Sequence, residues 1–158
     1  MIREKRLEWD KEEFEELHNL IKLNDSLSHY EFLRIRNFKL ELSSRANEKD
    51  IQKITKSAFE SVEKDNIIEA IKKLKELDGV GIAIASTILA IKDPDKYCII
   101  DRKVLTNLGK KEWLKSYLSN PKIYKEYLAL MVDNAKKEGK KLRDYERELY
   151  EKKTNKEL

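Results

Sequence analysis

The sequence predicts an all-α protein. Its 158 residues include only four Gly and two Pro, which favours long helices over a turn-rich β fold. Apolar residues make up 40% of the chain and charged residues 41%, and the apolar ones recur at helical intervals. These features are typical of amphipathic helices with strongly solvated outer faces. We expect one domain over residues 1–158, because this length is enough for a single hydrophobic core.

Two helices are predicted before residue 44. Asp10 and Glu13 have the spacing of a capping box ahead of periodic apolar residues, which predicts a helix over residues 10–23. Residues 25–43 are also predicted to be helical. Residues 38–42 alternate between apolar and polar as in a strand, but an isolated strand would have no partner here.

Two more helices lead to a glycine-containing turn. Asn47 is expected to cap a helix that ends near Val62. Asp65 is expected to cap the next helix, whose apolar positions continue to Leu77. A helix after the turn is ended sharply by Pro94.

The second half of the chain continues as helices with short connections. Residues 97–100 form a short apolar connection, after which Asp101 stands at the N-cap of a helix closed by Gly109. Further helices are expected over residues 113–118, over residues 121–138 behind an Asn120 cap, and over residues 142–149. The charged tail at about residues 150–158 is expected to fray.

Composition excludes several kinds of site. The one cysteine, Cys98, cannot form an internal disulfide, nor a four-cysteine zinc or iron–sulfur site within one chain. Without a His and carboxylate cluster at ligand spacing, we expect no metal and no cofactor. Because there is no apolar run of membrane-spanning length and residues 1–6 lack a signal-peptide core, we expect an intracellular protein, cytoplasmic or nucleoid-associated, without a membrane partner.

The stretch over residues 65–92 reads as helix, hairpin and helix. Its turn contains Gly79, Val80 and Gly81, and the two glycines permit backbone angles that side chains would forbid. The free amides of such a turn, with the start of the following helix, can hold a phosphate without reading sequence. The alternative is a bare helix–helix turn.

The motif Leu-x-x-Leu-x-Gly-Val-Gly-x-x-x-Ala-x-x-x-Leu over residues 74–89 is followed by Ile-Ile-Asp at residues 99–101. This combination resembles the helix-hairpin-helix DNA glycosylase (HhH-GPD) superfamily. The resemblance implies a two-lobed all-α fold in which the hairpin holds the backbone of duplex DNA. It also implies a carboxylate at the mouth of a pocket for a flipped base.

Carried onto this chain, the resemblance assigns backbone binding to the hairpin and the start of the next helix, at Gly79, Val80, Gly81, Ile82 and Ala83. It assigns catalysis to Asp101; the alternative for this residue is a plain N-cap.

The chain departs from the superfamily in three ways. Ala83 stands where bifunctional members have a nucleophilic lysine, so Schiff-base lyase chemistry is not expected. The cysteines of an iron–sulfur cluster are missing. Arg102 and Lys103 replace a small residue followed by His or Asn, and they are candidate DNA contacts.

The net charge is only +4, from 34 basic and 30 acidic residues, but it is unevenly distributed. Residues 92–115 carry seven basic and four acidic side chains, a difference of +3 around the motif. The first hypothesis is therefore a monofunctional DNA N-glycosylase acting on a damaged or mismatched base. The alternatives are a non-catalytic helix-hairpin-helix DNA-binding module of the same fold, and a helical protein-interaction domain that binds no nucleic acid.

Overall fold

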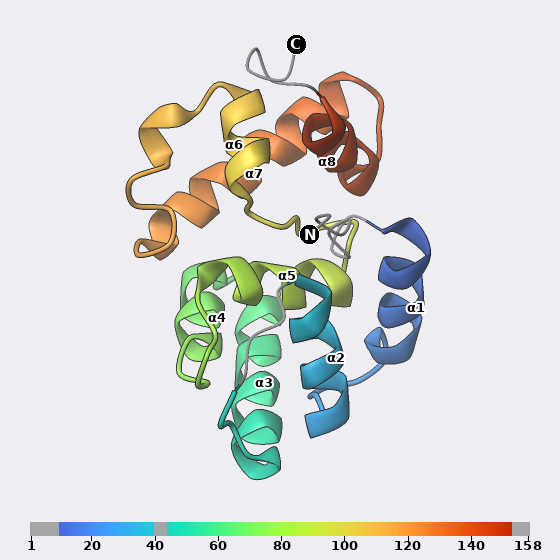
Figure 1. Cartoon of the computed structure of the whole chain (residues 1–158), viewed down its shortest axis with the longest axis vertical. Helices are drawn as coiled ribbons and strands as arrows, with labels where there is room; N and C mark the ends of the chain where they lie inside the picture. The colour runs from blue at the N-terminus through green and yellow to red at the C-terminus, as the bar shows by residue number, and fades with distance from the viewer. Residues whose placement is uncertain (1–9, 40–43, 153–158) are drawn as a thin grey trace, which may run out of the picture. The chain divides into compact units, whose positions relative to one another are not determined.

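The computed structural model describes residues 10–39 and 44–152, and over these ranges the chain is helical (Figure 1). The described residues form eight α-helices and a short 3₁₀ helix, with no strand among them. The predicted all-α class is therefore confirmed. The chain divides into two compact units, Met1–Val80 and Gly81–Leu158. The single domain over residues 1–158 stays a prediction.

Four helices form the first unit: α1 (Lys11–Ile21), α2 (His29–Lys39), α3 (Glu48–Glu63) and α4 (Ile67–Leu74). Helix α2 packs against α1 and α3, and α3 packs along α4. Apolar side chains at helical spacing fill the core between them, as amphipathic helices require. This core includes Phe14, Leu17, Ile21, Phe32, Ile35, Phe38, Ile51, Ala58, Ile71 and Leu74.

Two of the predicted N-caps of this unit are confirmed. The Asp10 carboxylate accepts the N–H of Glu13 at 2.9 Å, at the start of α1. The Asn47 side chain accepts the N–H of Asp50 at 2.9 Å, at the start of α3. Each bond satisfies one of the amides that a helix start leaves without an intrahelical partner.

The prediction for α4 is wrong at both ends. Asn66, not Asp65, caps the helix, and its side chain accepts the N–H of Glu69 at 3.3 Å. Asp65 instead has a φ of 58° and makes the left-handed turn out of α3, a conformation that Asp tolerates better than most residues. The helix ends at Leu74, because the N–H of Leu77 bonds back only three residues, to the Leu74 carbonyl.

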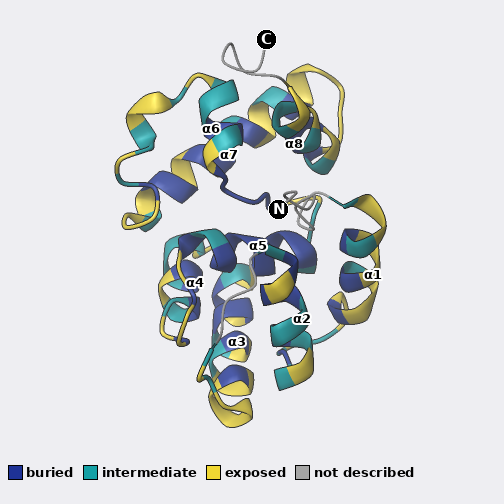
Figure 2. Ribbon diagram, viewed as in Figure 1, coloured by how far each residue is buried: buried dark blue, intermediate teal, exposed yellow. Residues whose placement is uncertain are grey.

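The second unit contains α5 (Ile82–Lys92), α6 (Arg102–Leu108), the 3₁₀ helix η2 (Lys111–Trp113), α7 (Pro121–Lys137) and α8 (Leu142–Glu151). Helix α8 packs against α6 and α7, and α5 packs against α7. Helix α5 is buried almost all round, since every residue from Ile82 to Ile91 is buried except Ala83 (Figure 2). The predicted Asn120 cap of α7 and the Gly109 end of α6 are confirmed.

The helix predicted over residues 113–118 is wrong. Only the 3₁₀ helix η2 forms, and turns follow it. Bonds that span three residues, such as the one from the Leu114 N–H to the Lys111 carbonyl, dominate here. Of the apolar side chains, Tyr117 is buried but Leu118 is 53% exposed, so a longer helix would gain little buried surface.

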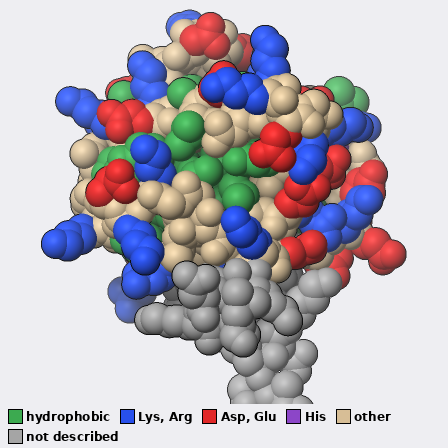
Figure 3. Space-filling model, turned by 90° about the horizontal axis from the view of Figure 1, so that it is seen from above, with side chains coloured by type: hydrophobic (Ala, Val, Ile, Leu, Met, Phe, Trp, Pro, Cys, Tyr) green, Lys and Arg blue, Asp and Glu red, His purple; other side chains and the backbone are tan. Residues whose placement is uncertain are grey.

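No helix in the described ranges is long and apolar enough to cross a membrane. On the face drawn in Figure 3, Lys and Arg side chains alternate with Asp and Glu around a central apolar area. Two predictions fall partly outside the described residues: the alternating pattern at positions 40–42 and the charged tail at positions 153–158.

Candidate nucleic-acid interface

In the first unit, the turn after α4 places glycine backbone at the surface and apolar side chains in the interior. Gly79 is exposed, whereas Leu77 and Val80 are buried. The N–H of Val80 donates to the Leu77 carbonyl at 3.1 Å and closes the turn. Gly79 has a φ of 77°, a left-handed conformation that disfavours other residues, so the expectation of a conformational glycine is confirmed here.

The carbonyls of this turn are held by residues far away in the sequence. The Ser44 hydroxyl donates to the Asp78 carbonyl at 2.6 Å, and Arg36 Nη2 donates to the Gly79 carbonyl at 2.9 Å. The Asp78 carboxylate accepts the N–H of Arg45 at 2.7 Å. These bonds fix the first half of the hairpin to α2 and to the segment before α3.

In the second unit, Gly81 begins α5 without a side-chain cap. Its φ of −102° and ψ of −171° are extended angles that any residue can adopt, so Gly81 does not use the conformational freedom that glycine permits. A Cβ added to Gly81 would meet no described atom within 4 Å. The fold therefore does not require glycine at this position.

The amides of the first turn of α5 have no partner within their own helix, and no side chain caps this end among the described residues. Gly81 is exposed and Ala83 is partly exposed, while Ile82 is buried. The start of α5 is thus an uncapped helix terminus with partial positive charge, next to a glycine that leaves room for close approach.

Asp101 lies at the N-cap of α6. Its Oδ2 accepts the N–H of Lys103 at 2.9 Å and the N–H of Val104 at 3.3 Å, and the residue is only 3% exposed. The predicted cap is confirmed. A catalytic role for the same carboxylate stays a prediction.

Arg102 and Lys103 follow at the surface. Arg102 is exposed, whereas Lys103 is partly buried with its ammonium 4.9 Å from the centre of the Tyr150 ring. This cation–π contact draws Lys103 toward α8. Arg102 is accordingly the more accessible of the two basic residues.

A buried, non-helical segment over residues 97–100 leads into Asp101. Tyr97 is 6% exposed, and Cys98, Ile99 and Ile100 are fully buried. A segment of this kind has no helical or sheet ladder, so its N–H and C=O groups need other partners.

Side chains from three helices supply those partners. Tyr124 and Tyr127 of α7 donate their hydroxyls to the Cys98 and Ile99 carbonyls, at 2.9 and 2.8 Å. The N–H of Ile99 donates to the Glu146 carboxylate on α8, and the N–H of Ile100 donates to Ser86 Oγ on α5 at 3.0 Å. We call these four side chains, Ser86, Tyr124, Tyr127 and Glu146, the connection clamp.

Glu146 has no exposed surface, and Arg143 Nη1 pairs with its carboxylate at 2.7 Å. Burying a carboxylate is unfavourable unless it is paired and hydrogen-bonded, and here both conditions are met. The sequence contained a signal for this residue: Glu146 falls on the same helical face as Leu142, Tyr145 and Leu149. A lone carboxylate on an apolar stripe indicates a buried polar contact.

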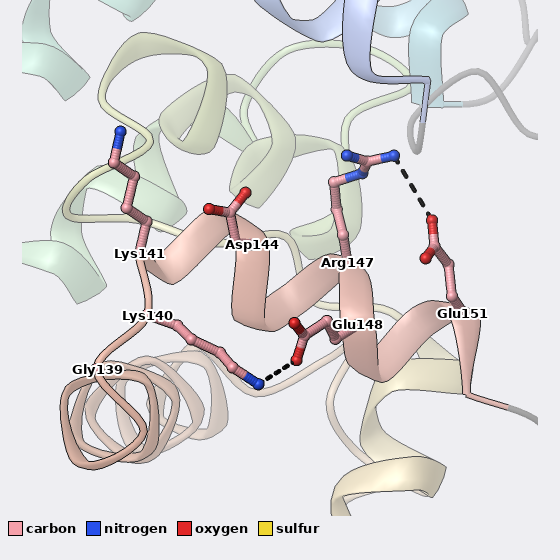
Figure 4. A pocket seen from close by; sticks show the side chains of 7 residues that line it. All are labelled: Gly139, Lys140, Lys141, Asp144, Arg147, Glu148 and Glu151. Carbon is pink, nitrogen blue, oxygen red and sulfur yellow. Dashed lines mark hydrogen bonds and ion pairs between the residues drawn. The ribbon is translucent and has the colours of Figure 1, made fainter.

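Two surface hollows of about 440 Å³ each lie in the second unit, and Asp101 lines neither. One is drawn in Figure 4, where Lys140 points toward Glu148 and Arg147 toward Glu151. The lining of this hollow therefore has no excess of positive or negative charge. It is lined by Gly139, Lys140, Lys141, Asp144, Arg147, Glu148 and Glu151. The other is lined by Asn107, Leu108, Asn134, Glu138, Tyr145, Glu148, Leu149 and Lys152.

No family model, curated protein or solved structure matches the chain. Membership of the helix-hairpin-helix glycosylase superfamily therefore stays a prediction based on the motif.

We predict opposite outcomes for alanine at the two hairpin glycines. Gly81→Ala should change the free energy of unfolding by less than about 0.5 kcal/mol, because its angles and space accept a Cβ. Gly79→Ala should cost about 1–2 kcal/mol, because a side chain is strained at positive φ. Urea unfolding followed by circular dichroism measures both. Equal losses for the two variants would contradict the backbone assignment.

We also predict that the protein loses stability in alkaline solution. Burial raises the pKa of the Cys98 thiol and of the Tyr124 and Tyr127 phenols well above their ordinary values. In the unfolded chain the Cys thiol ionises at about pH 8.5 and the Tyr phenols at about pH 10. Their contribution is therefore complete below about pH 8 and declines as the pH rises past those unfolded-state values.

Urea unfolding between about pH 7 and pH 11 tests this decline. It should be shallower in Cys98→Ala and in Tyr127→Phe than in the wild type. Tyr30→Phe is the control, because Tyr30 is 62% exposed, and its decline should match the wild type. Identical slopes in all four proteins would contradict the prediction.

Proposed function

We propose that this chain binds the backbone of duplex DNA through residues 79–83 and is a monofunctional DNA N-glycosylase. The observation that carries the binding step is the uncapped start of α5 at Gly81. The backbone angles of Gly81 are ones that any residue can adopt, and a Cβ added there would meet open space. A glycine that the fold does not need is well suited to let a partner approach the backbone closely.

The chemistry of this terminus favours an anion. The first-turn amides point out of the helix start, and the helix dipole adds partial positive charge, so a phosphate oxygen is a fitting acceptor. The seven basic and four acidic side chains of residues 92–115 add a favourable field. Arg102, exposed one residue after Asp101, is a candidate phosphate contact.

The catalytic step rests on the resemblance at Asp101. In this proposal the carboxylate stabilises positive charge on the deoxyribose as the bond from C1′ to the base breaks. A water molecule then adds to C1′ and loses a proton, which leaves an abasic site and the free base. Ala83 offers no amine at the position of the family's nucleophile, so no imine forms there.

We predict that Gly81→Ala weakens binding to a short duplex by on the order of tenfold, because its Cβ occupies the space next to the bound phosphate. Fluorescence anisotropy measures the affinity. Gly139→Ala, in the turn between α7 and α8, is the control. It is strained at a φ of 65° and should lower stability, yet the folded protein should keep its affinity. Equal affinities for Gly81→Ala and the wild type would refute the proposed contact.

We predict that the wild type leaves abasic sites in at least one duplex of a panel with damaged and mismatched bases, and that Asp101→Asn abolishes this. Asn keeps a side-chain oxygen that can cap α6, so the fold should survive. Asp95→Asn removes the same charge from an exposed position and should keep full activity. If DNA is bound and no base is released, the enzyme proposal fails.

A second candidate is a DNA-binding module without base excision. It is favoured by the 3% exposure of Asp101 and by the two amides that its Oδ2 already accepts. Under this alternative Asp101→Asn leaves DNA affinity unchanged or slightly stronger, and Gly81→Ala still weakens it.

A further inference from the structure

A buried arginine outside the motif is bonded to the turn that begins the hairpin. Arg36 lies on α2, is 1% exposed, and donates from Nη2 to the Gly79 carbonyl at 2.9 Å. The two residues are 43 positions apart in the sequence. A hydrogen bond with a charged donor is about twice as strong as one between neutral groups.

Gly79 needs such a partner. It has no side chain to pack, and glycine has more conformational freedom to lose on folding than any other residue. The bonds from Ser44 to the Asp78 carbonyl and from Arg36 to the Gly79 carbonyl fix two consecutive carbonyls of the turn. These bonds thereby hold the backbone of the turn at the end of the first unit.

Arg36 also brings a charge to this turn. Burial lowers the pKa of its guanidinium and the nearby Asp78 carboxylate raises it, but a guanidinium stays protonated in proteins. Asp78 is exposed beside Gly79, and its negative charge opposes an approaching phosphate. The fixed positive charge of Arg36 offsets that repulsion.

An apolar side chain could fill the same interior space without the cost of burying a charge. Unlike an apolar residue, Arg36 donates a hydrogen bond to the Gly79 carbonyl and places a positive charge near Asp78. Both act at Gly79, the first residue of the proposed contact over residues 79–83.

We infer that Arg36 is the positioning residue of the DNA-binding hairpin. It fixes the conformation of the turn and offsets the negative charge of Asp78, without touching DNA. This inference rests on the proposed function, because it presupposes that the hairpin holds a phosphate.

The test compares two arginines of α2. Arg36→Met should weaken binding to a short random-sequence duplex by about tenfold, because the energy of one charge-assisted hydrogen bond no longer holds the turn in its binding conformation. Arg34→Met removes the same charge from the same helix, but Arg34 pairs with Glu13 and not with the hairpin, so its effect should be less than about twofold. Anisotropy gives the affinities and urea unfolding gives the stabilities.

The conservative variants guard against loss of the fold in Arg36→Met. Arg36→Lys keeps the charge and one donor, so its affinity should lie between those of the wild type and Arg36→Met, while Arg34→Lys should match the wild type. The slope of log affinity against log salt should be unchanged in Arg36→Met, because Arg36 contacts a carbonyl and releases no counterion.

The outcomes separate the two claims. If the wild type binds no duplex, or if Gly81→Ala binds as well as the wild type, the proposed hairpin contact fails and this inference with it. If Gly81→Ala weakens binding but each folded Arg36 variant binds as its Arg34 counterpart does, only the role of Arg36 is refuted. A reduced salt slope in Arg36→Met would likewise refute it, in favour of direct phosphate contact.

Discussion

The second unit depends on satisfying the backbone of four buried residues. Positions 97–100 have neither a helical ladder nor, in the described chain, a neighbouring strand, yet their polar groups lie in the interior. An unpaired buried amide or carbonyl costs roughly as much as a lost hydrogen bond. The connection clamp supplies partners for four of these groups from α5, α7 and α8, so one irregular segment is bonded to three helices.

The clamp also accounts for the position of Asp101. The residue follows directly after the clamped segment, and its own carboxylate starts α6. The backbone that precedes Asp101 is therefore held by hydrogen bonds to three helices, whether this residue serves as a catalyst or only as a cap. Glu146 is the member of the clamp that costs most to bury. A fully buried carboxylate is tolerated only while Arg143 and the Ile99 amide remain bonded to it.

Local chemistry made much of the fold predictable. The caps at Asp10, Asn47 and Asn120 depend on bonds spanning two or three residues, which sequence spacing reveals. The misses had other causes: residues 113–118 have helical spacing but too little surface to bury, and Asp65 and Asn66 are both capable of capping. The partners of the hairpin and of the connection were not foreseen, since their bonds join residues between 14 and 47 positions apart.

The two hairpin glycines show that the same residue type in a motif can have different structural reasons. Gly79 is required by the chain itself, because its φ is positive. Gly81 has ordinary angles and open space around the missing Cβ, so internal structure gives no reason for it. The missing side chain leaves room for a partner to come close to the backbone, as the proposed DNA contact requires. The proposed DNA contact accordingly depends most on Gly81, and it is independent of Asp101, whose carboxylate has a sufficient structural role as a cap.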